Sequence, residues 1–128
     1  IAAKEESPIQ AAAVNNLARV YILTGQLEDA DNLLSNQTAT EDSLTQAALL
    51  KNRGWLQFEL GNKAKAKALL NQSIEINPTR PDAYCLLAII TGNEDDRITC
   101  ISLPTPINQP EIQQWKSQLS QIPNQPNP

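Results

Sequence analysis

Few side chains in this sequence could carry chemistry, and their types argue against catalysis. The 128 residues include no histidine, which removes the commonest general base and the usual activator of a nucleophilic thiol. The two cysteines, Cys85 and Cys100, therefore have no imidazole to activate them. We predict that the chain is not an enzyme and that it binds no cofactor and no metal ion.

Cys85 and Cys100 still admit two interpretations. One is a disulfide bond across a helical hairpin in an oxidising compartment. The other is a pair of small buried thiols in a helical core, which is a common place for cysteine. Because two cysteines alone do not indicate a disulfide framework, we favour the buried thiols and leave the pairing open.

Charged side chains cluster at three places. Acidic runs at 28–31 and 94–96 each fall at the start of a predicted helix, where carboxylates favour the positive end of the helix dipole. Neither run has the spacing of a calcium-binding loop. Lys63, Lys65 and Lys67 form a basic run in which Lys65 points away from the other two. This run either binds an acidic partner or an anionic surface, or is a solvated outer face, and we favour the solvated face.

The composition limits the class of partner. The net charge is −4, whereas a protein that binds nucleic acid needs a basic stripe, so we expect no nucleic-acid partner. No apolar run approaches the ~18 residues of a membrane-spanning helix, so we expect no direct membrane insertion of this segment. The sequence contains no methionine, which fits either a processed product or a segment of a longer chain, and we expect a domain of a larger protein. It shows no targeting segment, and the compartment stays unassigned.

Turn and cap signals divide the chain into helices. Gly25, Gly61 and Gly92 are placed to end helices in the left-handed conformation. Ser43 and Gln46 have the spacing of a capping box. The predicted helices span 8–24, 27–35, 43–60, 63–76, 81–91, 94–103 and 110–122. The other segments are a flank at 1–7, a loop at 36–42, a connector at 105–109 and a disordered tail at 123–128.

The same pattern of residues occurs twice at a fixed interval. Gly61 follows Gly25 by 36 positions (61 − 25), and Ala66 follows Ala30 by the same interval (66 − 30). A third start is marked by Tyr84, which lies 34 positions (84 − 50) after its equivalent in the second copy. Periods of this length are typical of stacked helical hairpins, which bury their apolar faces against one another.

These residues resemble the tetratricopeptide repeat family. The best match is 47–80, where small Gly54 and Ala66, large Leu70 and closing Pro78 stand where the family motif expects such types. Weaker copies fall at 11–44 and, truncated, at 81–103. The resemblance implies an all-α fold, a right-handed α-α superhelix or solenoid of antiparallel helix hairpins. We expect a single domain over 8–122, closed by a capping helix at 110–122.

The resemblance also implies a function and a site. Such arrays bind a protein or peptide in a concave groove lined by the first helix of each hairpin, so we predict a non-catalytic interaction module, part of a scaffold or assembly protein. The predicted groove residues are Asn15, Arg19, Lys51, Asn52, Trp55 and Phe58, because aromatic and arginine side chains are frequent at binding hot spots. The alternative is that Trp55 and Phe58 only pack between repeats. The third repeat offers Asp82 and Leu86 where a clamp for a peptide carboxylate would need basic side chains, so we expect no such clamp.

Two other functions stay open. The chain can be the accessory domain of a multidomain enzyme whose catalytic part lies elsewhere. It can also self-associate as a homo-oligomer, through the groove or through the C-terminal helix. Trp115 bears on self-association, because it has two interpretations. It either anchors the capping helix to the third hairpin, which we favour, or marks an exposed apolar stripe that pairs with another copy.

Overall fold

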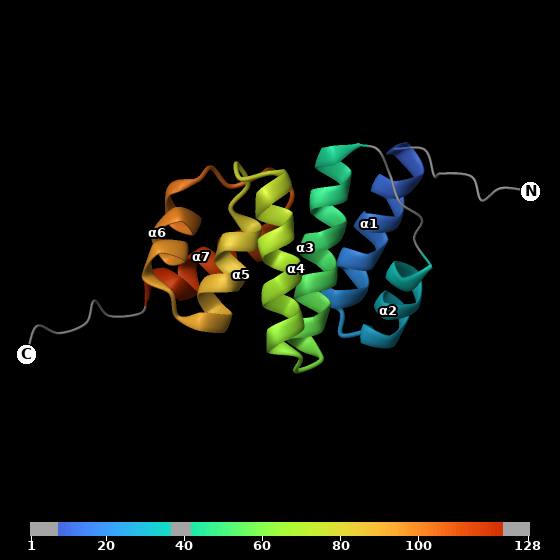
Figure 1. Ribbon diagram of the computed structural model, residues 1–128, viewed down its shortest axis with the longest axis horizontal. Helices are drawn as coiled ribbons and strands as arrows, with labels where there is room; N and C mark the ends of the chain where they lie inside the picture. The colour runs from blue at the N-terminus through green and yellow to red at the C-terminus, as the bar shows by residue number, and fades with distance from the viewer. Residues whose placement is uncertain (1–7, 37–41, 122–128) are drawn as a thin grey trace, which may run out of the picture. The chain divides into compact units, whose positions relative to one another are not determined.

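The computed structural model describes residues 8–36 and 42–121, and in these ranges the chain is all-α, as predicted (Figure 1). It contains seven helices and no strand there, with the bounds α1 Pro8–Leu23, α2 Leu27–Ser35, α3 Ser43–Glu59, α4 Lys63–Ile76, α5 Asp82–Thr91, α6 Glu94–Ser102 and α7 Pro110–Ser120. The predictions for the 1–7 flank, most of the 36–42 loop and the 123–128 tail fall outside the described residues. No described helix combines the length and the apolar character needed to cross a membrane.

The two equivalent turn glycines end the first helix of their hairpins as predicted. Gly25 has φ +77° and Gly61 has φ +89°, a left-handed conformation that a Cβ atom makes costly. Each turn lets the chain reverse, so that α1 and α2 form one hairpin and α3 and α4 form the next, as Figure 1 shows.

The capping residue of α3 differs from the prediction. Asp42, not Ser43, is the N-cap, and its Oδ2 accepts hydrogen bonds from the backbone N–H of Thr45 at 2.9 Å and from the Thr45 hydroxyl. The aspartate precedes the serine by one residue and is purely an acceptor when ionised, so it satisfies the exposed N–H of the first turn. Asn93 caps α6 in the same way, since its Oδ1 accepts from the backbone N–H of Asp96 at 2.9 Å.

The chain divides into two compact units, residues 1–78 and 79–128, called here the N-terminal and C-terminal units. In the N-terminal unit, α1 packs on α2 and α3, and α3 packs on α2 and α4. The α3–α4 contact is close at Gly54, where an added Cβ would lie 2.8 Å from Leu70 Cγ and 3.2 Å from the carbonyl O of Ala66. The small residue at Gly54 is therefore what lets these two helices approach. The single domain over 8–122 stays a prediction.

In the C-terminal unit, α5 packs on α6 and α7 around a small apolar core. The core residues are Cys85, Ala88, Cys100, Ile112 and Leu119, with Tyr84, Ile89 and Trp115 packed against them. Trp115 thus lies on the core of its own unit, as the anchoring interpretation predicts.

The favoured interpretation of the cysteines is wrong, because Cys85 and Cys100 form a disulfide bond. Their Cα atoms are 4.9 Å apart, within the ~4.4–6.8 Å that a disulfide spans. The α5–α6 hairpin brings together two residues that are 15 positions apart in sequence, and no count of cysteines reveals this proximity.

Candidate functional site

The predicted groove residues lie on α1 and α3, which pack side by side in the N-terminal unit. Two of them are joined directly, since the amide Nδ2 of Asn52 donates to Asn15 Oδ1 at 2.5 Å and to the Asn15 carbonyl O at 3.1 Å. Asn52 is buried, and its Oδ1 has no hydrogen-bond partner among the described residues. The asparagine pair therefore links the two helices and retains one unsatisfied acceptor.

Lys51 and Trp55 form a second pair, one helical turn apart on α3. The Lys51 ammonium lies 5.7 Å from the centroid of the Trp55 ring, within the ~6 Å range of a cation–π contact. Both side chains are only 4% exposed. Such burial is expected if Trp55 only packs between repeats. Arg19 and Phe58 are half-buried, so part of each side chain stays accessible to a partner.

Asp82 and Leu86, which weighed against a carboxylate clamp, are both buried. Asp82 pairs with Arg80 at 3.1 Å, and the same guanidinium nitrogen, Nη2, donates to Gln109 Oε1 at 3.0 Å. These contacts tie the start of α5 to the start of α7 within the C-terminal unit, so the charge of Asp82 has a structural partner.

The acidic run at 94–96 lies in the first turn of α6, as predicted. Glu94 forms a salt bridge with Arg97, and the hydrogen bond from that guanidinium holds the pKa of the Glu94 carboxyl below its usual value. Partial burial raises the pKa of Asp96, and the neighbouring Asp95 charge adds to the effect. Over the described residues, no three acidic or cysteine side chains are placed to hold a metal ion.

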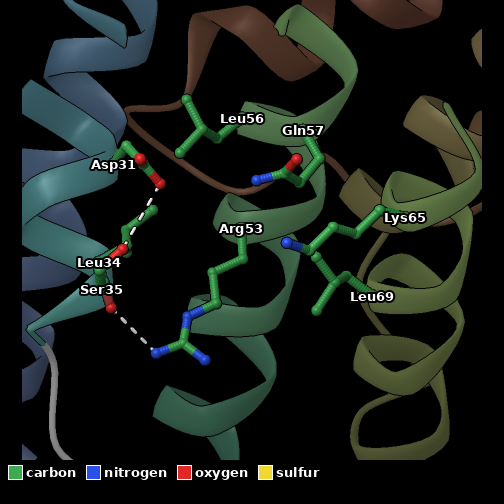
Figure 2. A pocket seen from close by; sticks show the side chains of 8 residues that line it. All are labelled: Asp31, Leu34, Ser35, Arg53, Leu56, Gln57, Lys65 and Leu69. Atoms are coloured by element: carbon green, nitrogen blue, oxygen red, sulfur yellow. Dashed lines mark hydrogen bonds between the residues drawn. The ribbon is translucent and has the colours of Figure 1, made fainter. Parts of the chain in front are cut away.

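A pocket that the sequence did not predict opens between α2, α3 and α4 (Figure 2). Its volume is about 350 Å³, near the lower end of the ~300–1,000 Å³ typical of ligand pockets. It is lined by Asp31, Leu34, Ser35, Arg53, Leu56, Gln57, Lys65 and Leu69. The sequence singled out only Lys65 among its basic residues, as part of a solvated face.

The pocket lies on a different face of α3 from the predicted groove residues. Leu56 and Gln57 lie three and four residues after Arg53, so the three side chains share one face of the helix. The groove residues of α3, at 51, 52, 55 and 58, are offset from these three positions and share another face of the helix. The spacing of Arg53, Leu56 and Gln57 was the signal that the sequence offered for this pocket. It indicates a pocket only once the positions of α2 and α4 are known.

One comparison with known proteins gave a match. The family model of the tetratricopeptide repeat matches residues 47–80. The match confirms the resemblance, and it covers most of α3, Gly61, the whole of α4 and Pro78, the hairpin with the close approach at Gly54. A search of curated proteins and a search of solved structures each found no match. The tetratricopeptide repeat is an all-α hairpin typical of protein–protein interaction modules, and the repeats at 11–44 and 81–103 stay predictions.

Proposed function

We propose that this chain is a non-catalytic module that binds a segment of a partner protein, as part of a larger scaffold or assembly protein. The observation that carries the proposal is the tetratricopeptide repeat at 47–80, packed through α3 against the hairpin that precedes it. Helices that are rigid before the partner arrives reduce the entropy lost on binding.

The binding surface in this proposal is formed by α1 and α3, around Asn15, Arg19, Asn52 and Phe58. The hydrogen bonds from Asn52 to Asn15 support it, because they fix the two helices that carry the surface before a partner arrives. Arg19 and Phe58 supply the part-exposed side chains that such a segment would meet first.

The test is partner capture with the full-length protein carrying Arg19→Ala and Phe58→Ala together. We expect the captured partner to fall at least about tenfold, since hot-spot residues each contribute ~1–2 kcal/mol or more. Trp55 and Lys51 are left unchanged because they are buried, so their replacement would perturb the fold. The circular dichroism of the variant should match that of the parent.

The matched control is Lys67→Ala with Glu75→Ala, two exposed positions on α4. This variant should retain the captured partner. Equal losses in the control and the test variant, or no loss in either, would remove α1 and α3 as the binding surface.

A further inference from the structure

The pocket between α2, α3 and α4 arises because two helices share one neighbour. Both α2 and α4 pack on α3, and among the described residues they do not pack on each other. A notch is therefore left above α3, with α2 along one side and α4 along the other. All eight lining residues belong to the N-terminal unit, and none of them is part of the α1–α3 surface.

The lining carries more positive than negative charge. Arg53 and Lys65 face a single carboxylate, that of Asp31, although the whole chain carries a net charge of −4. Asp31 accepts a long hydrogen bond of 3.5 Å from the Ser35 hydroxyl, and within the described ranges it pairs with neither cation. The two positive charges are thus not neutralised inside the pocket.

Both cations can bind an incoming acceptor. Arg53 uses one nitrogen, Nη2, to donate to the Leu34 carbonyl O at 3.0 Å, and a guanidinium has five N–H donors. In Figure 2, Lys65 extends from α4 toward Arg53 and Gln57 on α3, and it has no hydrogen bond or ion pair with the described part of the chain. Gln57 accepts from Asn62 Nδ2 at 2.8 Å through its Oε1, which leaves its amide nitrogen as a third donor.

The remaining lining is apolar. Leu34 and Leu56 are buried beneath the opening, and Leu69 is half-buried on the α4 side. Cationic donors beside an aliphatic wall are complementary to a carboxylate that stands next to an apolar side chain. The volume of about 350 Å³ suits a few side chains of an extended segment rather than a whole helix.

We infer that this pocket binds a segment of a partner protein in which a glutamate or aspartate lies beside a large apolar residue. Arg53 and Lys65 bind the carboxylate, and Leu69 contacts the apolar side chain. The inference is independent of the α1–α3 surface, because the two surfaces share no residue and lie on different faces of α3.

The probe is a pair of pentapeptides blocked at both ends, one with a glutamate beside two leucines and the other with glutamine in its place. Each is titrated into the ¹⁵N-labelled chain, and the amide shifts are followed by NMR. We expect shifts confined to 31–35, 53–57 and 65–69, and about tenfold tighter binding of the glutamate peptide, which corresponds to ~1.4 kcal/mol.

Variants separate the two parts of the recognition. Lys65→Ala should weaken the glutamate peptide about fivefold and leave the glutamine peptide unchanged, whereas Leu69→Ala should weaken both equally. Lys67→Ala is the matched control, since Lys67 is exposed on the same helix and does not line the pocket, and it should change neither affinity.

Three results would overturn the inference: no binding, equal affinity for the two peptides, or an unchanged affinity in Lys65→Ala. Shifts confined to α1 and the opposite face of α3 would also overturn it, while leaving the proposed α1–α3 surface intact. Partner capture that is retained in Arg19→Ala/Phe58→Ala would overturn the α1–α3 surface without bearing on the pocket, so the two proposals fail separately.

Discussion

At the scale of single residues, Asp42 fixes where α3 begins. The carboxylate accepts from both the hydroxyl and the N–H of Thr45, and these hydrogen bonds, the side-chain one foremost, hold the pKa of Asp42 below its usual value of 3.8. Because α3 contributes to the α1–α3 surface and to the pocket, an unravelled first turn would loosen the element that both sites share.

The first prediction concerns this cap and its pH dependence. A carboxyl group whose pKa is lowered in the folded state stabilises the fold above its unfolded pKa, and that contribution disappears as the pH falls through the folded pKa. Asp42→Ala should therefore lower the melting temperature at pH 7 and have less effect at about pH 2. Asp42→Asn keeps an acceptor without the charge, so it should destabilise the chain less than alanine at pH 7, and this effect of the lost charge should also shrink at about pH 2.

Thermal unfolding followed by circular dichroism measures this effect. The decisive quantity is the difference in melting temperature between the parent chain and the asparagine variant at each pH, because the remaining carboxylates titrate in both and largely cancel. A difference that does not shrink in acid would show that the Asp42 charge contributes nothing to the cap.

At the scale of helices, the α3–α4 hairpin depends on a missing side chain. An alanine at Gly54 would place its Cβ 2.8 Å from Leu70 Cγ, and Leu70 is fully buried. Ser73 adds a fixed point, since its hydroxyl donates to the Ala47 carbonyl O at 2.7 Å in a buried position. The register of the two helices, and with it the position of Lys65 over the pocket, follows from these contacts.

We predict that Gly54→Ala lowers the free energy of unfolding by about 1 kcal/mol. Overpacking costs ~1–3 kcal/mol, and the better helix propensity of alanine, worth up to ~1 kcal/mol, offsets part of it. Urea unfolding gives the value, and Ala68→Gly at an exposed position of α4 calibrates the propensity alone. If Gly54→Ala stabilised the chain by the amount that Ala68→Gly destabilises it, the close approach would have no energetic consequence.

The elements were largely predictable because their signals are local. The bounds of α2 and α4 agree with the predicted 27–35 and 63–76, since glycine, asparagine and proline restrict the backbone within a few residues of themselves. The cap of α3 was misplaced by one residue because Asp42 and Ser43 are both good capping residues. Only the observed hydrogen bond decides between them.

Features that join different elements were harder to predict. The disulfide depends on the rotation of α5 against α6, and the pocket depends on α2 and α4 both contacting α3 without contacting each other. The sequence of α4 alone predicts that Lys65 is solvated. It does not show that Lys65 and Arg53 of α3 line the same pocket. For the groove residues, the sequence placed Asn15 and Asn52 on neighbouring helices, but not the hydrogen bonds that bury Asn52.

At the scale of the whole molecule, the two units are held together internally by different means. The N-terminal unit relies on helix packing, with Leu34, Leu56 and Leu70 at most 2% exposed. The described residues of the C-terminal unit form three short helices around a small core that includes the disulfide. A small core buries little apolar surface, and a covalent link then becomes a large part of the stability.

We therefore predict that loss of the disulfide acts mainly on the C-terminal unit. Closing a loop of about 15 residues stabilises a fold by ~3 kcal/mol, and the bonded cysteines are 15 positions apart. Reduction of the full chain, or Cys85→Ala with Cys100→Ala, should speed amide hydrogen exchange in α5, α6 and α7 more than in α1–α4. The double variant should show no further change when reductant is added.

A uniform loss of protection across both units would mean that they unfold as one cooperative body. An unchanged exchange rate in α5 would mean that packing of Ile112 and Leu119 alone holds this unit together.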